Sequence, residues 1–227
     1  MSVGSPRVAK LGGNALAALG EALALTSQGT PVVIVHGGGR QITELMARRG
    51  IPPRFLGGRR FTDLPTLACV RTALANVSDG LVEAARSAGF TAVALRLGEV
   101  LRAEALPELG LVGRVRRVER APLDRIWASG AVPLVAPLAL DDGDRFLNVN
   151  ADDVAAALAI ALGAAELLFL SDVPGVLDER GDVMARVPAS APPRVDGGMR
   201  PKLENARAAL AAGVPRVRIG LGTEVVR

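Results

Sequence analysis

The chain has 227 residues, a formal net charge of +4 and one cysteine, Cys69, which excludes an internal disulfide. Aromatic residues make up only 3%, and the basic residues are scattered among acids, as over 114–125, so we expect no nucleic-acid partner. The sequence contains no apolar run of about 20 residues and no secretory segment at its start, which predicts a cytoplasmic protein that binds no membrane.

Strand and helix patterns alternate along the chain. The first part reads, in order, as a strand (8–13), a helix (14–27), a strand (31–35), a helix (41–50), a turn-rich region (51–63), a long helix broken near 78–80 (64–88) and a strand (91–95). Asn14 is the expected N-cap of the first helix. Because a strand, a helix and a second strand follow one another, we expect parallel strands joined by right-handed crossovers.

The second part continues the alternation. It reads as a hairpin (97–118), a helix (121–130), a strand (131–137), a turn with a short strand (141–150), a helix (151–164), a strand running into a loop (166–177), an irregular Pro-rich region (178–196), a helix (199–212) and two strands (215–220 and 223–227). Asn150 is the expected cap of the helix over 151–164. The whole pattern predicts one α/β domain, a three-layer α/β/α sandwich around a mostly parallel sheet, with ligands at the carboxyl ends of the strands.

The two lysines are the most informative cationic residues. Of 27 basic residues only Lys10 and Lys202 are lysine, and both lie at glycine-rich junctions between a loop and a helix. Lys202 falls in the first turn of its helix, where the helix dipole disfavours a positive charge. An anion held between the glycine amides and the ammonium groups would remove this conflict.

Three further clusters lie at expected strand ends. His36 precedes three consecutive glycines, Arg60 lies in a glycine-rich loop, and Asn148, Asn150 and Asp152 lead into a helix. We interpret His36 as structural, because no set of metal ligands surrounds it. A Walker A sequence and a Ser or Cys nucleophile constellation are both absent. Two lysines, several glycine clusters and an Asp suit phosphoryl transfer, which depends on positioning and charge neutralisation.

The ordered motifs resemble those of the amino-acid kinase family. They are KLGGN, VHGGG, G-x-R-x-TD, LGLVGRV, NVNAD, SDVPGVL and GGM-x-PK, and they cover residues 7–226. The resemblance implies an acyl-substrate lobe over about 1–138 and a nucleotide lobe over about 139–227. Among the members of the family, it implies an enzyme of arginine biosynthesis that uses ATP and Mg²⁺ to phosphorylate the side-chain carboxylate of N-acetyl-L-glutamate, giving N-acetyl-L-glutamyl 5-phosphate.

The resemblance also assigns roles to residues of this sequence. Lys10 and Lys202 would flank the transferring phosphoryl group, and Asp152 would hold the two ammonium groups. The residues implied to bind the acyl substrate are Gly38, Gly39, Arg60 and Asn148. The residues implied to bind the nucleotide are Gly12, Gly13, Ser171, Asp172, Val173, Gly175, Leu177, Gly198 and Met199. No protein metal ligand is implied, because the ATP phosphates would hold most of the Mg²⁺ coordination.

Several alternatives stay open from the sequence. A kinase of the same family could act on aminoadipate or glutamate linked to a carrier protein, or on carbamate or uridylate. A non-catalytic nucleotide-binding relative is a third alternative, favoured by the short segment after residue 220 and opposed by the retained Lys10, Asp152 and Lys202. In the family that the motifs resemble, a helical extension before the first strand accompanies arginine-inhibited hexamers. The sequence has no such extension, so the resemblance implies an arginine-insensitive homodimer, and we expect its interface on the helix over 64–88.

Overall fold

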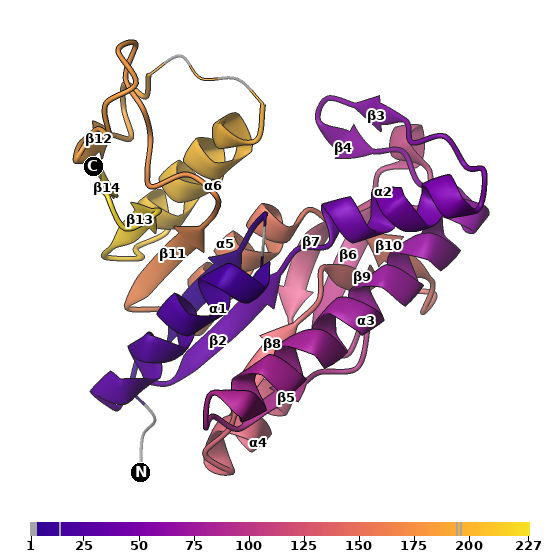
Figure 1. Cartoon of the computed structure of the whole chain (residues 1–227), viewed down its shortest axis with the longest axis horizontal. Coiled ribbons are helices and arrows are strands. Elements are labelled where there is room, and N and C mark those ends of the chain that lie inside the picture. The colour runs from indigo at the N-terminus through magenta and orange to yellow at the C-terminus, as the bar shows by residue number, and fades with distance from the viewer. Residues whose placement is uncertain (1–3, 14, 194, 196) are drawn as a thin grey trace.

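A computed structural model describes residues 4–13, 15–193, 195 and 197–227. Its largest unit is an eight-stranded sheet in the order β12-β14-β13-β11-β1-β2-β8-β5 (Figure 1). The strands are β1 (Arg7–Leu11), β2 (Val32–His36), β5 (Ala92–Ala94), β8 (Val132–Val135), β11 (Glu166–Leu170), β12 (Arg186–Pro188), β13 (Val217–Ile219) and β14 (Thr223–Val226). All neighbours pair in parallel except β13 and β14, so the predicted mostly parallel sheet is confirmed.

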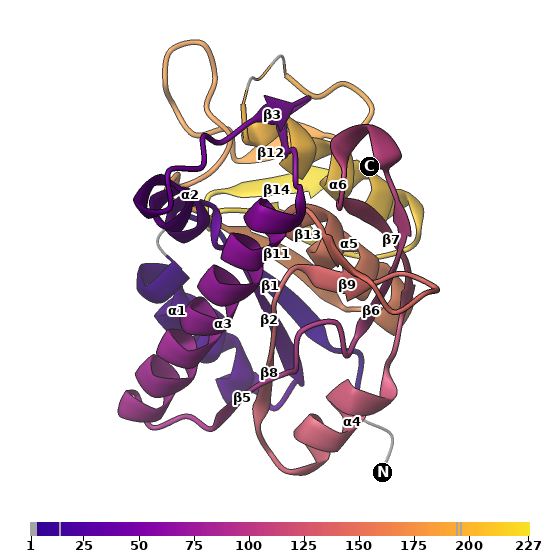
Figure 2. The ribbon, with the colours of Figure 1, turned by 90° about the vertical axis from the view of Figure 1, so that its right-hand side faces the viewer.

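Helices cover both faces of this sheet, as predicted. On one face lie α1 (Ala15–Ala24) and α3 (Leu64–Ser87); on the other lie α4 (Ala121–Ala128), α5 (Ala151–Leu162) and α6 (Met199–Ala211) (Figure 2). Successive side chains of β1 alternate between the two layers: Ala9 and Leu11 pack with α1, whereas Val8 packs with α5 and α6. The same alternation directs Lys10 toward α5.

Smaller sheets complete the fold. The predicted hairpin over 97–118 is present as β6 (Leu101–Ala105) and β7 (Gly113–Val118), with a single helical turn, η2 (Pro107–Leu109), between them. The short strand predicted within 141–150 is present as β10 (Phe146–Asn148). With β9 (Leu138–Leu140), which the sequence did not predict, it extends this hairpin into a four-stranded sheet. The turn-rich region forms a separate two-stranded hairpin, β3 (Phe55–Leu56) and β4 (Arg59–Arg60), after α2 (Gly39–Arg48).

The structure contradicts one expectation about the helices and confirms another. The break predicted near 78–80 is wrong, because α3 runs unbroken; the Ser78 hydroxyl contacts His36 Nε2 at 2.8 Å, and Gly80 lies in open space. Asn150 caps α5 as predicted, since its side-chain oxygen accepts from two backbone N–H groups. Helix α1 is followed by η1 (Leu25–Gln28), and its predicted cap, Asn14, lies outside the described residues. No helix in the described chain is both long and apolar enough to span a membrane.

Candidate active site

The carboxyl ends of β1 and β2 border a cavity of about 310 Å³. Its lining includes eight of the residues that the sequence singled out: Lys10, Gly12, Gly13, Gly38, Gly39, Arg60, Asn148 and Asp152. The volume is at the lower end of the range typical of small-molecule sites. Strands β1 and β2, the hairpin β3–β4 and the start of α5 thus contribute to one site, although these segments are far apart in the sequence.

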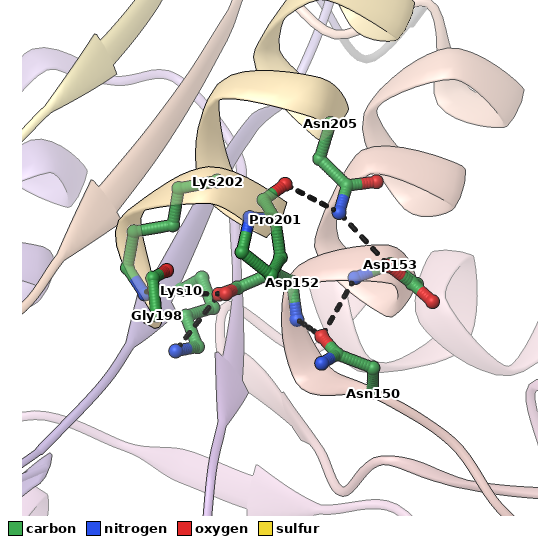
Figure 3. A network of polar contacts seen from close by, with 8 residues as sticks. All are labelled: Lys10, Asn150, Asp152, Asp153, Gly198, Pro201, Lys202 and Asn205. Atoms are coloured by element: carbon green, nitrogen blue, oxygen red, sulfur yellow. Dashed lines mark hydrogen bonds and ion pairs between the residues drawn. The ribbon is translucent and has the colours of Figure 1, made fainter. Parts of the chain in front are cut away.

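A buried ionic cluster lies at one side of this cavity. Lys10 from β1 and Lys202 from α6 point toward Asp152 in the first turn of α5 (Figure 3). The Nζ atom of Lys10 lies 2.8 Å from one Asp152 carboxylate oxygen, and that of Lys202 lies 3.2 Å from the other. Lys202 also donates to the carbonyl oxygen of Gly198 at 3.1 Å. The sequence predicted that these three side chains meet, and the structure brings them together.

The charges in this cluster are unevenly matched. Two ammonium groups contact one carboxylate, and all three side chains are buried. Burial lowers the pKa of Lys10, and the positive charge of Lys202 lowers it further, while Asp152 opposes both effects. The exposed Asp172 adds a weaker attraction toward Lys10. An anion placed beside the cluster would complete its charge balance, because buried charges are stable only when they are paired.

Glycines keep the space around Lys10 open. A Cβ added to Gly12 would lie 2.9 Å from the ammonium nitrogen of Lys10, so a side chain there would crowd the cluster. Gly13 has a φ of +54°, and a Cβ on it would overlap the Asp172 carboxylate. At the end of β2, Gly38 and Gly39 form the start of α2, whose first N–H groups favour an anion. Both glycine loops therefore present backbone close to the cavity.

Arg60 is a buried cation without an acidic partner among the described residues. Its guanidinium donates to the Gly39 carbonyl oxygen at 3.2 Å, to the Thr43 hydroxyl at 2.9 Å and to the Met46 sulfur at 3.2 Å. Its ring contact is with Phe55, whose centroid lies 4.8 Å away. Burial lowers the pKa of Arg60, although an Arg stays protonated at neutral pH. A buried guanidinium with neutral partners is suited to bind a ligand carboxylate.

Asn148 lies beside the same cavity and has a fixed orientation. Its side-chain nitrogen donates to the Thr62 hydroxyl at 3.0 Å, and that hydroxyl donates to the Arg60 carbonyl oxygen at 3.0 Å. Thr62 is fully buried. The contact links the end of β10 to the segment that carries Arg60. The two predicted substrate residues are therefore held at fixed positions relative to each other. The sequence did not indicate that Thr62 joins them.

The remaining predicted nucleotide residues lie outside the cavity lining, and one of them, Gly198, contacts the ionic cluster through Lys202. Ser171, Asp172, Val173, Gly175 and Leu177 follow β11, and Gly198 and Met199 begin α6. The loop is anchored at its far end, where the Val176 N–H donates to the Thr223 hydroxyl at 2.8 Å. The Ser171 hydroxyl oxygen is buried, and within the described part of the chain it has no hydrogen-bond partner. Val173 and Leu177 are partly exposed apolar side chains at this edge.

His36 is structural, in agreement with the interpretation from sequence. It is fully buried, and its ring nitrogens contact the Ser78 hydroxyl and the Gly37 carbonyl oxygen, each at 2.8 Å. Burial lowers the pKa of His36, which keeps the ring neutral. Three polar residues near the site were missed from the sequence: Arg59, Asp153 and Asn205. The adjacent pairs 59–60 and 152–153 were a signal, but their partners became evident only from the fold.

Comparisons with known proteins identify the family of the chain. The sequence model of the amino acid kinase family matches residues 5–220. Acetylglutamate kinase of Rubrobacter xylanophilus is 44% identical over 218 residues, covering 92% of this chain and 86% of that protein. Acetylglutamate kinase of Geobacillus stearothermophilus is 36% identical over 236 residues, covering 97% and 91%.

Solved structures show the same fold. The protein smu.665 of Streptococcus mutans superposes with a TM-score of 0.89 at 30% identity, covering 97% of this chain and 98% of that one. Carbamate kinase of Giardia lamblia, bound to AMP-PNP, superposes with a TM-score of 0.71 at 16% identity over all of both chains. The second likeness shows a shared fold alone.

Proposed function

This chain belongs to the amino acid kinase family, and on that premise we propose that it transfers the γ-phosphoryl group of ATP to the side-chain carboxylate of N-acetyl-L-glutamate, as a step of arginine biosynthesis. The product is N-acetyl-L-glutamyl 5-phosphate. The observation that carries the proposal is the buried cluster of Lys10, Asp152 and Lys202, which lies in the same site as the unpaired Arg60. Relatives named acetylglutamate kinase, at 36–44% identity over most of the chain, support this acceptor.

The acceptor is bound at the end of the cavity formed by α2 and the hairpin. In the proposed arrangement Arg60 takes the α-carboxylate, and Asn148 takes the acetamido group. Arg60 has neutral partners, so the carboxylate supplies the charge that it lacks. The N–H groups of Gly38 and Gly39 are available to an acceptor oxygen. With the α-carboxylate held there, the side-chain carboxylate extends toward Lys10.

The transfer itself needs charge neutralisation rather than proton transfer. A carboxylate oxygen forms a bond to the γ-phosphorus while the bond from that phosphorus to the bridging oxygen breaks, and ADP leaves with the electron pair. The nucleophile is already an anion, so no general base is required. Lys10 and Lys202 reduce the repulsion between the two anions, and Asp152 is the positioning residue for both ammonium groups.

Mg²⁺ fits this site as an ion carried by the nucleotide. Among the described residues, no group of three His, Cys, Asp or Glu side chains could hold a metal ion, and both Asp152 oxygens face lysines. Mg²⁺ commonly binds substrate phosphates with one or two carboxylates at most. The ATP phosphates would therefore hold the ion, which supplies further neutralisation of their charge.

The nucleotide is proposed to lie beside β11 and α6. Gly12 and Gly13 border the phosphates, while Ser171, Asp172, Val173, Gly175, Leu177, Gly198 and Met199 border the adenosine. The unpartnered Ser171 hydroxyl and the exposed apolar surface of Val173 and Leu177 support this position. The Giardia structure contains AMP-PNP within the same fold.

We extend the proposal to the organisation of the chain. Residues of about 1–138 form the acceptor lobe, and about 139–227 form the nucleotide lobe. ATP and the acceptor are metabolites of the cytoplasm, which is the proposed location. A homodimer with α3 at its interface is the proposed assembly.

Trapping of the acyl phosphate tests the proposal. The protein is incubated with ATP, Mg²⁺ and hydroxylamine, and the hydroxamate is quantified with N-acetyl-L-glutamate, glutamate, aminoadipate or no acceptor. We expect hydroxamate with N-acetyl-L-glutamate alone. Absence of product with every free acid would overturn the proposal and direct the search to an acceptor linked to a carrier protein or to a non-catalytic protein.

A further inference from the structure

The hairpin β3–β4 carries Arg60 into the site, yet it has little packing of its own. It is a two-stranded sheet that joins neither larger sheet. Phe55 and Leu56 are about half exposed, so burial of apolar side chains does not hold its tip. On one side Arg60 binds α2, through the Gly39 carbonyl and the Thr43 hydroxyl. Thr62 anchors the end of the hairpin through hydrogen bonds with Leu109, Leu111 and Asn148. On the opposite side, a polar contact holds the hairpin strands against α5.

Arg59 makes such a contact. Its Nη2 atom lies 2.6 Å from an Asp153 carboxylate oxygen, across 94 positions of sequence. The second oxygen of Asp153 accepts from the Asn205 side-chain nitrogen at 2.8 Å, and that nitrogen also donates to the Pro201 carbonyl oxygen (Figure 3). We call the series Arg59, Asp153 and Asn205 the Arg59 relay. It runs from the hairpin through α5 to α6.

The relay touches three of the four elements that hold a charged group of the site, namely the hairpin, α5 and α6; the fourth, β1, carries Lys10. Asp153 is adjacent to Asp152, which binds both lysines, and Asn205 lies one helical turn after Lys202. On the hairpin, Arg59 is adjacent to Arg60. Hence two neighbouring residues of α5 organise two different sets of contacts: Asp152 holds the ammonium groups, and Asp153 holds the hairpin.

The cost of this arrangement indicates a role other than stability. The Nη1 atom of Arg59 is buried and has no hydrogen-bond partner among the residues that the structure describes. An unsatisfied buried donor destabilises the folded state, and such atoms are rare in native proteins. The ion pair is only partly buried, with side-chain exposures of 32% for Arg59 and 17% for Asp153, so its own stabilisation is modest. The contact therefore contributes more to the position of the hairpin than to the free energy of folding.

We propose that Arg59 is a positioning residue for phosphoryl transfer: through Asp153 it fixes the hairpin, and with it Arg60, relative to Lys10 and Lys202. The proposal rests on the function proposed above. In the proposed arrangement Arg60 binds the α-carboxylate of the acceptor, so a hairpin that shifts without the Asp153 contact would bind the acceptor less tightly. The relay couples the place where the acceptor is held to the place where the phosphoryl group is neutralised.

Steady-state kinetics of Arg59→Gln, Asp153→Asn and the double variant test the coupling. We expect the KM for N-acetyl-L-glutamate to rise about tenfold in each single variant, with the KM for ATP changed by less than about twofold. The double variant should lose no more than either single variant, because both remove one contact. Arg54→Gln is the matched control, since Arg54 is at the base of the same hairpin, where its guanidinium lies over the Phe61 ring and weakly attracts Asp63 rather than Asp153. Additive losses, or a KM equal to that of the control, would overturn the proposal.

Rescue by lysine separates positioning from direct contact with a ligand. The ion pair uses a single nitrogen of Arg59, so Arg59→Lys can replace it and should restore the KM to within about threefold of wild type. A lysine variant as impaired as Arg59→Gln would overturn the positioning role.

Hydrogen exchange of the hairpin tests the relay without turnover. The Phe61 N–H donates to the Arg54 carbonyl oxygen at 2.9 Å, and we expect amides of residues 54–61 to exchange faster in Arg59→Gln than in Arg54→Gln. Equal exchange would overturn the relay. If the wild-type protein forms no hydroxamate while exchange responds as expected, the proposed function fails and the relay stands.

Discussion

At the scale of single residues, the site is built around charges that are costly to bury. Lys10 and Lys202 share the carboxylate of Asp152, and all three are buried. Removal of two ammonium groups and a carboxylate from water costs free energy that one pairing does not fully offset. An anionic ligand offsets this cost, so the cluster favours the binding of a phosphate group. The side chains that favour activity at these positions therefore lower the stability of the folded protein.

Lys10→Met tests this opposition. The variant keeps the pair of Asp152 and Lys202, fills the same space and removes the ammonium group whose pKa is lowered by burial. We expect a melting temperature at least as high as that of wild type, together with loss of hydroxamate formation. Differential scanning calorimetry measures the first quantity. A fall of more than about 3 °C, equivalent to about 1 kcal/mol for a chain of this size, would contradict the account.

Much of the site could be predicted from the residue types in the sequence. The scarcity of lysine among 27 basic residues pointed to Lys10 and Lys202, and the glycine clusters pointed to the loops around them. Arg59 could not be found in this way, because it is one of 25 arginines and its partner is 94 positions away. Likewise Glu166 is buried against Arg7, Arg216 and Arg218, a group assembled only when three strands align.

At the scale of elements, helix α3 illustrates how a local signal sets a boundary. Asp63 is its N-cap and accepts from the Thr66 backbone N–H at 2.9 Å, and a proline follows in the first turn. Contacts with the hydroxyl and the backbone N–H of Thr66 lower the pKa of Asp63 below its usual value of 3.8. The charged form is thus favoured in the folded state. Because α3 follows directly after Arg60 and Thr62, this boundary also fixes the end of the segment that carries them.

Asp63→Ala is expected to lower the free energy of unfolding by about 1 kcal/mol at pH 6, as for other N-caps. The folded pKa of Asp63 lies below the unfolded one, so its charge stabilises the protein above about pH 3.8 and this contribution is lost as pH falls through the folded value. Urea unfolding at pH 6 and near pH 3 measures the difference between variant and wild type. A difference that stays constant with pH would contradict a role for the charge.

Strong local patterns predicted elements well, and weak ones did not. The apolar runs of β1, β2 and β11 are buried on both faces, as continuous apolar runs indicate. The unpredicted strand β9 is three residues long and owes its pairing to the neighbouring strands rather than to its own composition. The break expected in α3 does not occur, and the Ser78 hydroxyl instead contacts His36 of β2, a tertiary contact that no local pattern reveals.

At the scale of the whole molecule, strand order creates the site. β1 lies between β11 and β2, so the loops that follow these three strands meet at one edge of the sheet (Figure 1). Helices α5 and α6 cover the face toward which Lys10 points, and they bring Asp152 and Lys202 to it. The layer order and the parallel direction followed from the alternation of strands and helices. The order of the eight strands did not, because nothing in a single sequence states which strands are neighbours.

The most direct test of the account is the turnover number of Lys202→Ala, measured beside the dissociation constant of N-acetyl-L-glutamate for the same variant. Lys202 contacts Asp152 and does not line the cavity that holds Arg60, so its loss should spare acceptor binding. The account predicts that kcat falls about 10²–10³-fold, as when a preorganised charge is removed from a transition state, while the dissociation constant changes by less than about twofold. A kcat within about threefold of wild type would contradict the claim that the two lysines neutralise the transferring phosphoryl group.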